Sequence, residues 1–160
     1  VDGNNKLFPF VKKAQERGIV FDVGHGGGSF AFSQAIPAIV QGLKPNTIST
    51  DLHTGSMNRG MKDLLNVMSK FLNIGLNLNE VVSATTWDAA KVIKRNDLGN
   101  LSVGSVADLT ILNLRTGEFG FVDTKDKKIK GDKKLECELT IKDGKIVYDL
   151  NGISNKFWNE

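Results

Sequence analysis

Both histidines of this chain follow predicted β-strands and lie beside other polar residues that could do chemistry. Residues 19–23 read as a strand that runs into a glycine cluster around His25. Residues 47–50 read as a second strand, which ends on Asp51 and His53. Imidazole and carboxylate groups can bind a divalent metal, orient a substrate or transfer protons. Because the carboxyl ends of parallel strands open on one face, we expect these segments to meet where a ligand binds.

The elements that would position these residues alternate between helix and strand. Helices are expected over residues 7–16 and 33–41, with Pro37 in the first turn of the second helix, where its missing N–H does no harm. The order helix, strand, helix, strand predicts that the two strands pair in parallel. The strongest helical spacing then follows, in Met61, Leu64, Leu65, Met68, Phe71 and Leu72.

Two short helical segments are expected next, over residues 80–84 and 87–94. Asn79 and Thr86 are the predicted N-caps, because their side chains can accept hydrogen bonds from the first free N–H groups of a helix. The three-residue spacing of Trp87, Ala90 and Ile93 predicts that these side chains face inward.

After residue 97 the pattern changes to short β-rich runs separated by glycines. The runs are residues 107–112, 118–122, 135–141 and 145–148. Asp143-Gly144 between two alternating runs is a strong hairpin signal. We therefore expect an α/β region over residues 1–97 and a small antiparallel sheet over residues 98–160.

Composition narrows the class of protein without deciding it. The 160 residues are 40% hydrophobic and 24% charged, which is typical of a globular protein, and the net charge of +3 gives no reason to expect a nucleic-acid partner. The basic run 125–130 is interpreted as a solvated hairpin tip, and Cys137 as a buried, inert thiol. No signal peptide or long apolar span appears, so we expect no membrane partner and a cytoplasmic location.

Two kinds of site are compatible with the two strand ends. The glycine cluster partly satisfies the dinucleotide-binding fingerprint, with Asp51 placed to hold a ribose, although Ser29 and bulky Phe30 depart from that pattern. Alternatively, His25 and Asp51 could serve a divalent metal that activates water for hydrolysis. A noncatalytic scaffold is the third possibility, and the spacing alone leaves all three open.

Several stretches in order resemble the amidohydrolase superfamily, in particular its dihydroorotase-like, deacetylase and D-aminoacylase-like metallohydrolases. They are residues 18–30 (GIVFDVGHGGGSF), 49–53 (STDLH), 68–72 (MSKFL), 84–90 (ATTWDAA) and 98–109 (LGNLSVGSVADL). The resemblance continues over residues 137–153 and so covers most of the chain.

The resemblance implies a metal-dependent hydrolase on a (β/α)₈ barrel with a β-sandwich. It implies that Asp51 ends the eighth strand, binds one or two divalent ions, with zinc expected, and shuttles protons. His25 would end the seventh strand on the substrate side, with Gly26 and His53 as further contacts to a small-molecule substrate. Candidate substrates are N-acyl amino acids, acylated hydroxy acids and cyclic amides.

The chain departs from this family in what it lacks. The family's usual histidine ligands come from earlier strands, and there is no His-x-His motif here. A whole barrel needs about 200 residues or more. We therefore expect this chain to be the C-terminal part of the barrel, its last two strands and their helices, plus most of the sandwich. Its partner would be an N-terminal half, without which hydrolysis is not expected, and its unpaired strand edges would favour self-association into homo-oligomers.

Overall fold

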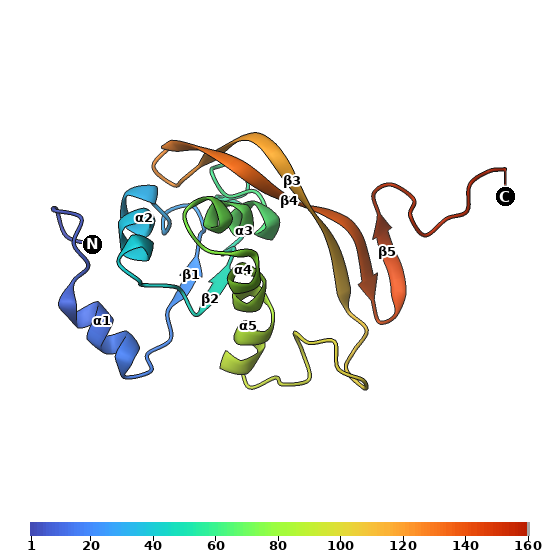
Figure 1. Cartoon of the computed structure of the whole chain (residues 1–160), viewed down its shortest axis with the longest axis horizontal. Helices are drawn as coiled ribbons and strands as arrows, with labels where there is room; N and C mark the ends of the chain where they lie inside the picture. Colours follow the sequence, from blue (N-terminus) through green and yellow to red (C-terminus); the bar gives the residue numbers. More distant parts are fainter. Residues whose placement is uncertain (160) are drawn as a thin grey trace.

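The computed structural model describes residues 1–159 and has a mixed α/β architecture (Figure 1). Its helices are α1 (Pro9–Glu16), α2 (Phe32–Val40), α3 (Leu64–Asn73), α4 (Leu78–Thr85) and α5 (Trp87–Val92). Its strands are β1 (Asp22–Gly24), β2 (Thr47–Ser49), β3 (Leu109–Val122), β4 (Lys128–Lys142) and β5 (Lys145–Asp149). β1 and β2 pair in parallel, as the order of elements predicts, and β3, β4 and β5 form an antiparallel sheet in that order.

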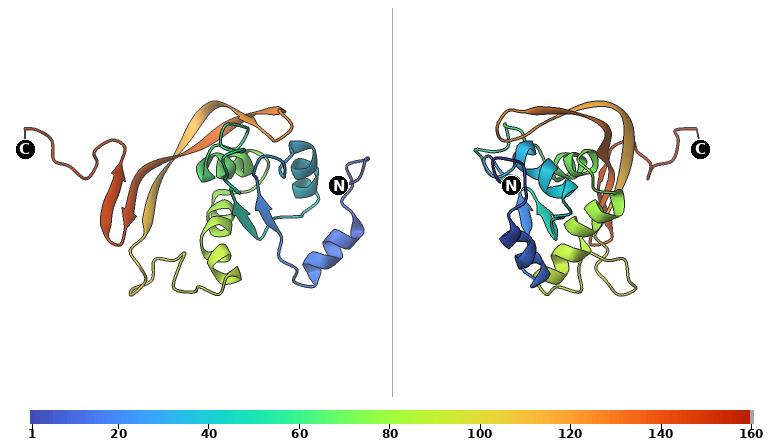
Figure 2. Two further views of the ribbon diagram at one scale, coloured as in Figure 1. Left: turned by 180° about the vertical axis from the view of Figure 1, so that it is seen from behind. Right: turned by 60° about the vertical axis from the view of Figure 1, so that its left-hand side comes forward.

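The long hairpin of β3 and β4 arches over the helical part of the molecule (Figures 1 and 2). Its last pair is Val122 with Lys128, so the lysine-rich run forms the hairpin tip, as predicted. β5 joins the sheet through Asp143 and Gly144, whose φ angles of 49° and 73° are both positive. Positive φ at both central residues is what a type I′ hairpin turn requires, which explains the Asp-Gly pair.

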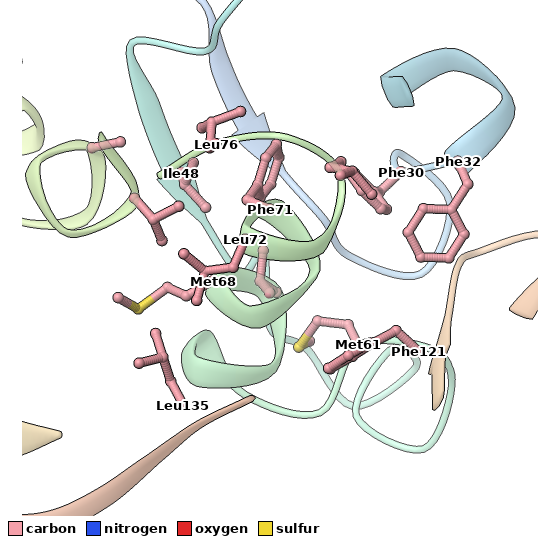
Figure 3. Packing of buried hydrophobic residues seen from close by; sticks show 14 residues of the cluster. Phe30, Phe32, Ile48, Met61, Met68, Phe71, Leu72, Leu76, Phe121 and Leu135 are labelled. Atoms are coloured by element: carbon pink, nitrogen blue, oxygen red, sulfur yellow. The ribbon is translucent and has the colours of Figure 1, made fainter. Parts of the chain in front are cut away.

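Side chains from the helices and from the hairpin share a hydrophobic core (Figure 3). Phe71 and Met61 are buried at its centre, and Phe121 and Leu135 reach it from β3 and β4. Burial of such large side chains is the main stabilising contribution of a core, and truncating one to alanine typically costs about 3–5 kcal/mol. Residues on both sides of the expected boundary after residue 97 therefore contribute to this core, while the division into two domains stays a prediction.

The predicted bounds of three elements were wrong. β1 is only three residues long, because residues 22–24 pair with β2 while Ile19 and Val20 are exposed. Helix α2 begins at Phe32, so Pro37 lies inside the helix rather than in its first turn. The runs 107–112 and 118–122 belong to one strand, interrupted between Thr116 and Phe119 by an irregular register.

The ends of α4 and α5 also differ from the prediction. Asn77, not Asn79, caps α4: its side chain accepts from the backbone of Glu80, and the Glu80 carboxylate accepts from the backbone of Asn77. This reciprocal capping box satisfies two N–H groups that the helix leaves free. On α5 only Ala90 of the expected inward face is buried, since Trp87 and Ile93 are 37% and 66% exposed. Within residues 1–159, no helix has the length and apolarity needed to cross a bilayer.

Candidate active site at the ends of β1 and β2

The two strand ends that the sequence singles out lie side by side. Gly24 is the register partner of Ser49 at the end of the parallel pair. Beyond the strands, the N–H of Gly26 donates to the carbonyl of Thr50 at 2.8 Å, so the pairing continues into the loops. The expectation that the segments carrying His25 and Asp51 meet at one face is confirmed.

Asp51 is exposed at this face and lies against the glycine loop. Its φ of 49° is in the left-handed region, which only a minority of residues other than glycine adopt. Gly26 has a φ of 47°, and a Cβ there would come within 3.1 Å of Cγ of Asp51 and closer still to Oδ2. The glycine is therefore needed for both its backbone angle and the close approach, and it lets the loop pass beside an accessible carboxylate.

His25 has no exposed surface in this chain, and both of its ring nitrogens have partners. Nδ1 lies 3.0 Å from the carbonyl oxygen of Gly26, and Nε2 lies 2.7 Å from Nζ of Lys70. Because a carbonyl can only accept, Nδ1 carries the proton and Nε2 accepts from the lysine. The ring also stacks on Phe30, with the centroids 4.7 Å apart. This geometry holds the glycine loop in place, and a contact between His25 and substrate stays a prediction.

Lys70 is a fully buried lysine that sequence reasoning missed. Besides His25, its Nζ donates to the carbonyl of Gly60 at 2.8 Å. Burial lowers the pKa of Lys70 to about 8, against the opposing effect of Asp123. Burial also lowers the pKa of His25, partly offset by the Gly26 carbonyl, so at neutral pH the lysine carries the charge and the imidazole is neutral.

The sequence does contain a signal for Lys70. Val67 and Ile74 lie three and four residues from it, and both are buried, so the lysine lies on an apolar face of α3. A lysine flanked in this way must either extend to water or find partners inside. Here it finds partners inside, on the two loops that follow β1 and β2.

His53 is exposed, two residues beyond Asp51, and it organises its own loop. Its Nδ1 accepts from the N–H of Gly55 at 3.1 Å, which leaves the proton of the neutral ring on Nε2. Ser56, buried below it, accepts from the N–H of His53 at 3.0 Å. A contact between His53 and substrate stays a prediction.

The residues that the structure describes do not complete a metal site by themselves. Among residues 1–159 there is no group of three or more His, Cys, Asp or Glu side chains that could hold a metal ion. Asp51 offers one accessible carboxylate, while the nitrogens of His25 are engaged elsewhere. Catalytic zinc usually takes three protein ligands, so further ligands would have to come from outside these residues.

The hairpin tip anchors the loop between β1 and α2. Asp123, which is buried, accepts from the N–H of Phe32 at 2.8 Å through Oδ2, and its other oxygen accepts from the N–H groups of Lys125 and Lys127. Burial opposes ionisation of Asp123, but these backbone donors outweigh it and lower its pKa. Thr124 adds a bond from its N–H to the carbonyl of Phe30 at 3.0 Å.

A separate cavity of about 590 Å³ opens near the amino-terminal ends of the strands, around Asn46. Its charged side chains are paired with one another: Lys44 with Glu80, and Lys91 with Asp88 at 2.8 Å. Such pairs leave no unmatched charge for a ligand. In parallel α/β folds it is the opposite, carboxyl-terminal face that carries the chemistry.

Comparisons with known proteins show the family to which this chain belongs. The sequence profile of the amidohydrolase family matches residues 49–148, which is more than half of the chain and includes Asp51 and His53. A deacetylase of Brucella anthropi is 42% identical over 118 residues, covering 74% of this chain and 29% of the relative. A deacetylase of Enterococcus faecalis is 32% identical over 146 residues, covering 91% of this chain and 39% of the relative.

Two solved structures superpose on most of this chain. The crystal structure of an adenine deaminase superposes with a TM-score of 0.86 at 32% identity, over 91% of this chain and 39% of that chain. The crystal structure of a dihydroorotase superposes with a TM-score of 0.80 at 34% identity, over 89% of this chain and 40% of that chain. The fold of this chain, with its parallel strand pair and attached antiparallel sheet, is thus shared with part of each of these structures. The chain belongs to the amidohydrolase family, and it spans 29–39% of the length of the curated relatives it matches.

Proposed function

We propose that this chain forms the C-terminal part of a metal-dependent amidohydrolase that hydrolyses an amide or ester. The observation that carries the proposal is the exposed Asp51 carboxylate at the carboxyl end of β2, held beside a glycine that allows close approach. The substrate classes are N-acyl amino acids, acylated hydroxy acids and cyclic amides, in keeping with relatives named deacetylase and dihydroorotase. His25, Gly26 and His53 form the substrate side of the site in this proposal.

In this proposal β1 and β2 are the last two strands of a (β/α)₈ barrel, and the antiparallel sheet is part of a β-sandwich. A preceding segment supplies the other strands and the remaining metal ligands, and the 160-residue chain by itself is inactive. Ile19 and Val20 near β1 are apolar and exposed, which supports the proposal that the preceding segment covers them. Self-association through unpaired strand edges and a cytoplasmic location stay predictions.

The role of Asp51 follows from its chemistry. A bound divalent ion, with zinc expected, would polarise the substrate carbonyl and activate a water molecule. The Asp51 carboxylate takes a proton from the attacking water and passes it to the leaving group, as general base and then general acid. Asp51 is exposed at the strand end, so its carboxylate is accessible to the attacking water and to the leaving group.

The nucleotide-binding alternative is weakened by the start of α2. A dinucleotide's pyrophosphate would bind the free N–H groups at the amino end of the helix that follows the glycine loop. In this protein the N–H of Phe32 at that end is already bonded to the buried carboxylate of Asp123. A second negative group there would meet like charge, so hydrolase chemistry is the better supported function.

A chimera tests the proposal. The 118-residue region of the Brucella anthropi deacetylase that matches this chain is replaced by the corresponding residues of this chain, and acetate release from N-acetyl amino acids is measured. We expect zinc-dependent hydrolysis, and Asp51→Asn is expected to lower kcat by at least about 100-fold. Asp97→Asn is the control, since Asp97 is exposed and its ion pair is with neighbouring Arg95.

A folded chimera that hydrolyses none of the three substrate classes would count against the proposal, and so would an Asp51→Asn chimera with full activity. The thermal unfolding of the chain itself discriminates the alternatives. Protection by NAD or ATP, with none by zinc or manganese, would favour a nucleotide-binding module. An inactive chimera together with no protection by any of these ligands would favour a noncatalytic scaffold.

A further inference from the structure

A single buried amine joins the two loops that carry the candidate site. We call residues 25–31 the glycine loop and residues 50–63 the Asp51 loop. Nζ of Lys70 lies 2.7 Å from Nε2 of His25 in the glycine loop and 2.8 Å from the carbonyl oxygen of Gly60 in the Asp51 loop. Because Lys70 stands on helix α3, it connects both loops to one rigid element.

We propose that Lys70 is a positioning residue: it locks His25 in the tautomer protonated at Nδ1 and so fixes the glycine loop against the carboxylate of Asp51. The effect of Lys70 on catalysis rests on the proposed function. The lock, by which we mean the single His25 tautomer held by Lys70, is a property of the folded chain.

The chain of contacts runs without a gap from the lysine to the carboxylate. Lys70 donates to Nε2 of His25, which obliges the imidazole proton to reside on Nδ1, and that N–H donates to the carbonyl of Gly26 at 3.0 Å. The N–H of the same Gly26 donates to Thr50, the residue before Asp51. Both polar groups of the Gly26 backbone are thus held where its Cα passes beside Asp51.

The Asp51 loop is fixed at its far end as well. The Cα of Gly60 lies so close to the hairpin that a Cβ would come within 2.6 Å of the carbonyl oxygen of Asp123. The carbonyl of Gly60 faces inward and accepts from Lys70. The lysine, the hairpin and the loop therefore meet at one point, and no water-exposed group takes part.

An ordinary structural role does not explain a lysine in this place. Burying an ammonium is expensive unless it is paired, and no carboxylate among residues 1–159 accepts a hydrogen bond from this one. The charged groups whose fields reach it are Asp123, which favours its charged form, and Lys62, which disfavours it. An apolar residue would fill the same space without this penalty, whereas only a donor can hold both loops.

The first test uses the 160-residue chain and needs no substitution. Imidazole ¹⁵N chemical shifts report the tautomer of each histidine directly. We expect His25 to carry its proton on Nδ1 at neutral pH. A ring protonated on Nε2, or one that exchanges between tautomers, would overturn the proposal whatever the enzyme activity proves to be.

The second test compares Lys70→Met with Lys62→Met, an exposed lysine in the Asp51 loop. Met keeps the length of the side chain but donates nothing, so His25 should lose its single tautomer and the N–H of Gly26 should exchange with solvent at least about tenfold faster. Lys62→Met should change neither. Unchanged tautomer and exchange in a folded Lys70→Met chain would contradict the lock.

The catalytic meaning is tested in the deacetylase chimera. Misplacing a catalytic group by about 1 Å can lower the rate about 100-fold, so Lys70→Met should reduce kcat by that order with a much smaller change in KM. An unchanged kcat in a chimera whose His25 tautomer is lost would refute the positioning role. An inactive parent chimera would count against the proposed function, while the two measurements on the chain still decide the lock.

Discussion

The backbone of Gly26 passes directly beside the side chain of Asp51, so closely that a Cβ on the glycine would lie 3.1 Å from Cγ of the aspartate. Both residues have positive φ angles, 47° and 49°. One residue with a left-handed backbone in each of two neighbouring loops brings Gly26 against the carboxylate of Asp51. The site therefore depends on the absence of a side chain at one position as much as on the presence of one at the other.

Gly26→Ala should disturb this arrangement. The new methyl group displaces the carboxylate of Asp51, and the left-handed backbone adds about 1–2 kcal/mol of strain. We expect urea unfolding to show a loss of about 1–3 kcal/mol. Gly28→Ala is the control, because nothing lies within 4 Å of a Cβ there, and it should change stability by less than about 0.5 kcal/mol. Equal stability of the two variants would contradict the close approach.

The elements near the site were predictable where the local sequence pattern determines the structure. The order of helices and strands gave the parallel pairing of β1 with β2, and Asp143-Gly144 gave the hairpin of β4 and β5. The extent of β1 was not predictable, because a strand ends where its partner ends. Apolar Ile19 and Val20 have no such partner among the described residues.

The supports of the site were hidden for a different reason. Lys70 lies 45 residues from His25, and Asp123 lies 91 residues from Phe32. Hydrogen bonds over such separations follow from how α3 and the hairpin pack on the strands, which no local pattern encodes. The apolar neighbours of Lys70 on α3 indicate that it is buried but do not reveal its partners, and Asp123 is distinguished only by its burial in the structure.

Asp51→Asn should leave the fold of the chain unchanged. Asparagine adopts positive φ more readily than most residues and has nearly the shape of aspartate. We expect a free energy of unfolding within about 0.5 kcal/mol of the unmodified chain, measured by urea titration. A large loss of stability would show that the carboxylate has a structural role and would weaken its assignment to chemistry.

Asp123→Asn should loosen the hairpin from the start of α2. The amide that replaces the carboxylate offers one acceptor instead of two, so the N–H groups of Phe32, Lys125 and Lys127 cannot all remain bonded. A loss of about 1–3 kcal/mol is expected, with faster hydrogen exchange at Phe32. Asp126→Asn, at an exposed position of the same turn, is the control and should alter neither quantity.

Mild acid should destabilise the chain through His25. Because burial lowers its folded-state pKa below the ordinary 6.5, the unfolded chain binds a proton before the folded chain does. The free energy of unfolding should therefore fall as the pH decreases from about 7 to about 5, with a slope of at most about 1.4 kcal/mol per pH unit from this group. The slope should be smaller in His25→Gln, as measured by urea unfolding across this range.

Alkaline pH should have the opposite effect through Lys70. Its folded-state pKa of about 8 lies below the ordinary 10.5, so between these values the unfolded chain binds the proton and the folded chain does not. Stability contributed by this group therefore increases as the pH rises from about 8 to 10.5, and the gap corresponds to at most about 3 kcal/mol. The measurement is the free energy of unfolding of the unmodified chain minus that of Lys70→Met, which removes the common effect of the other lysines. A difference that stays constant across this range would mean that Lys70 titrates normally and that its amine reaches water in solution.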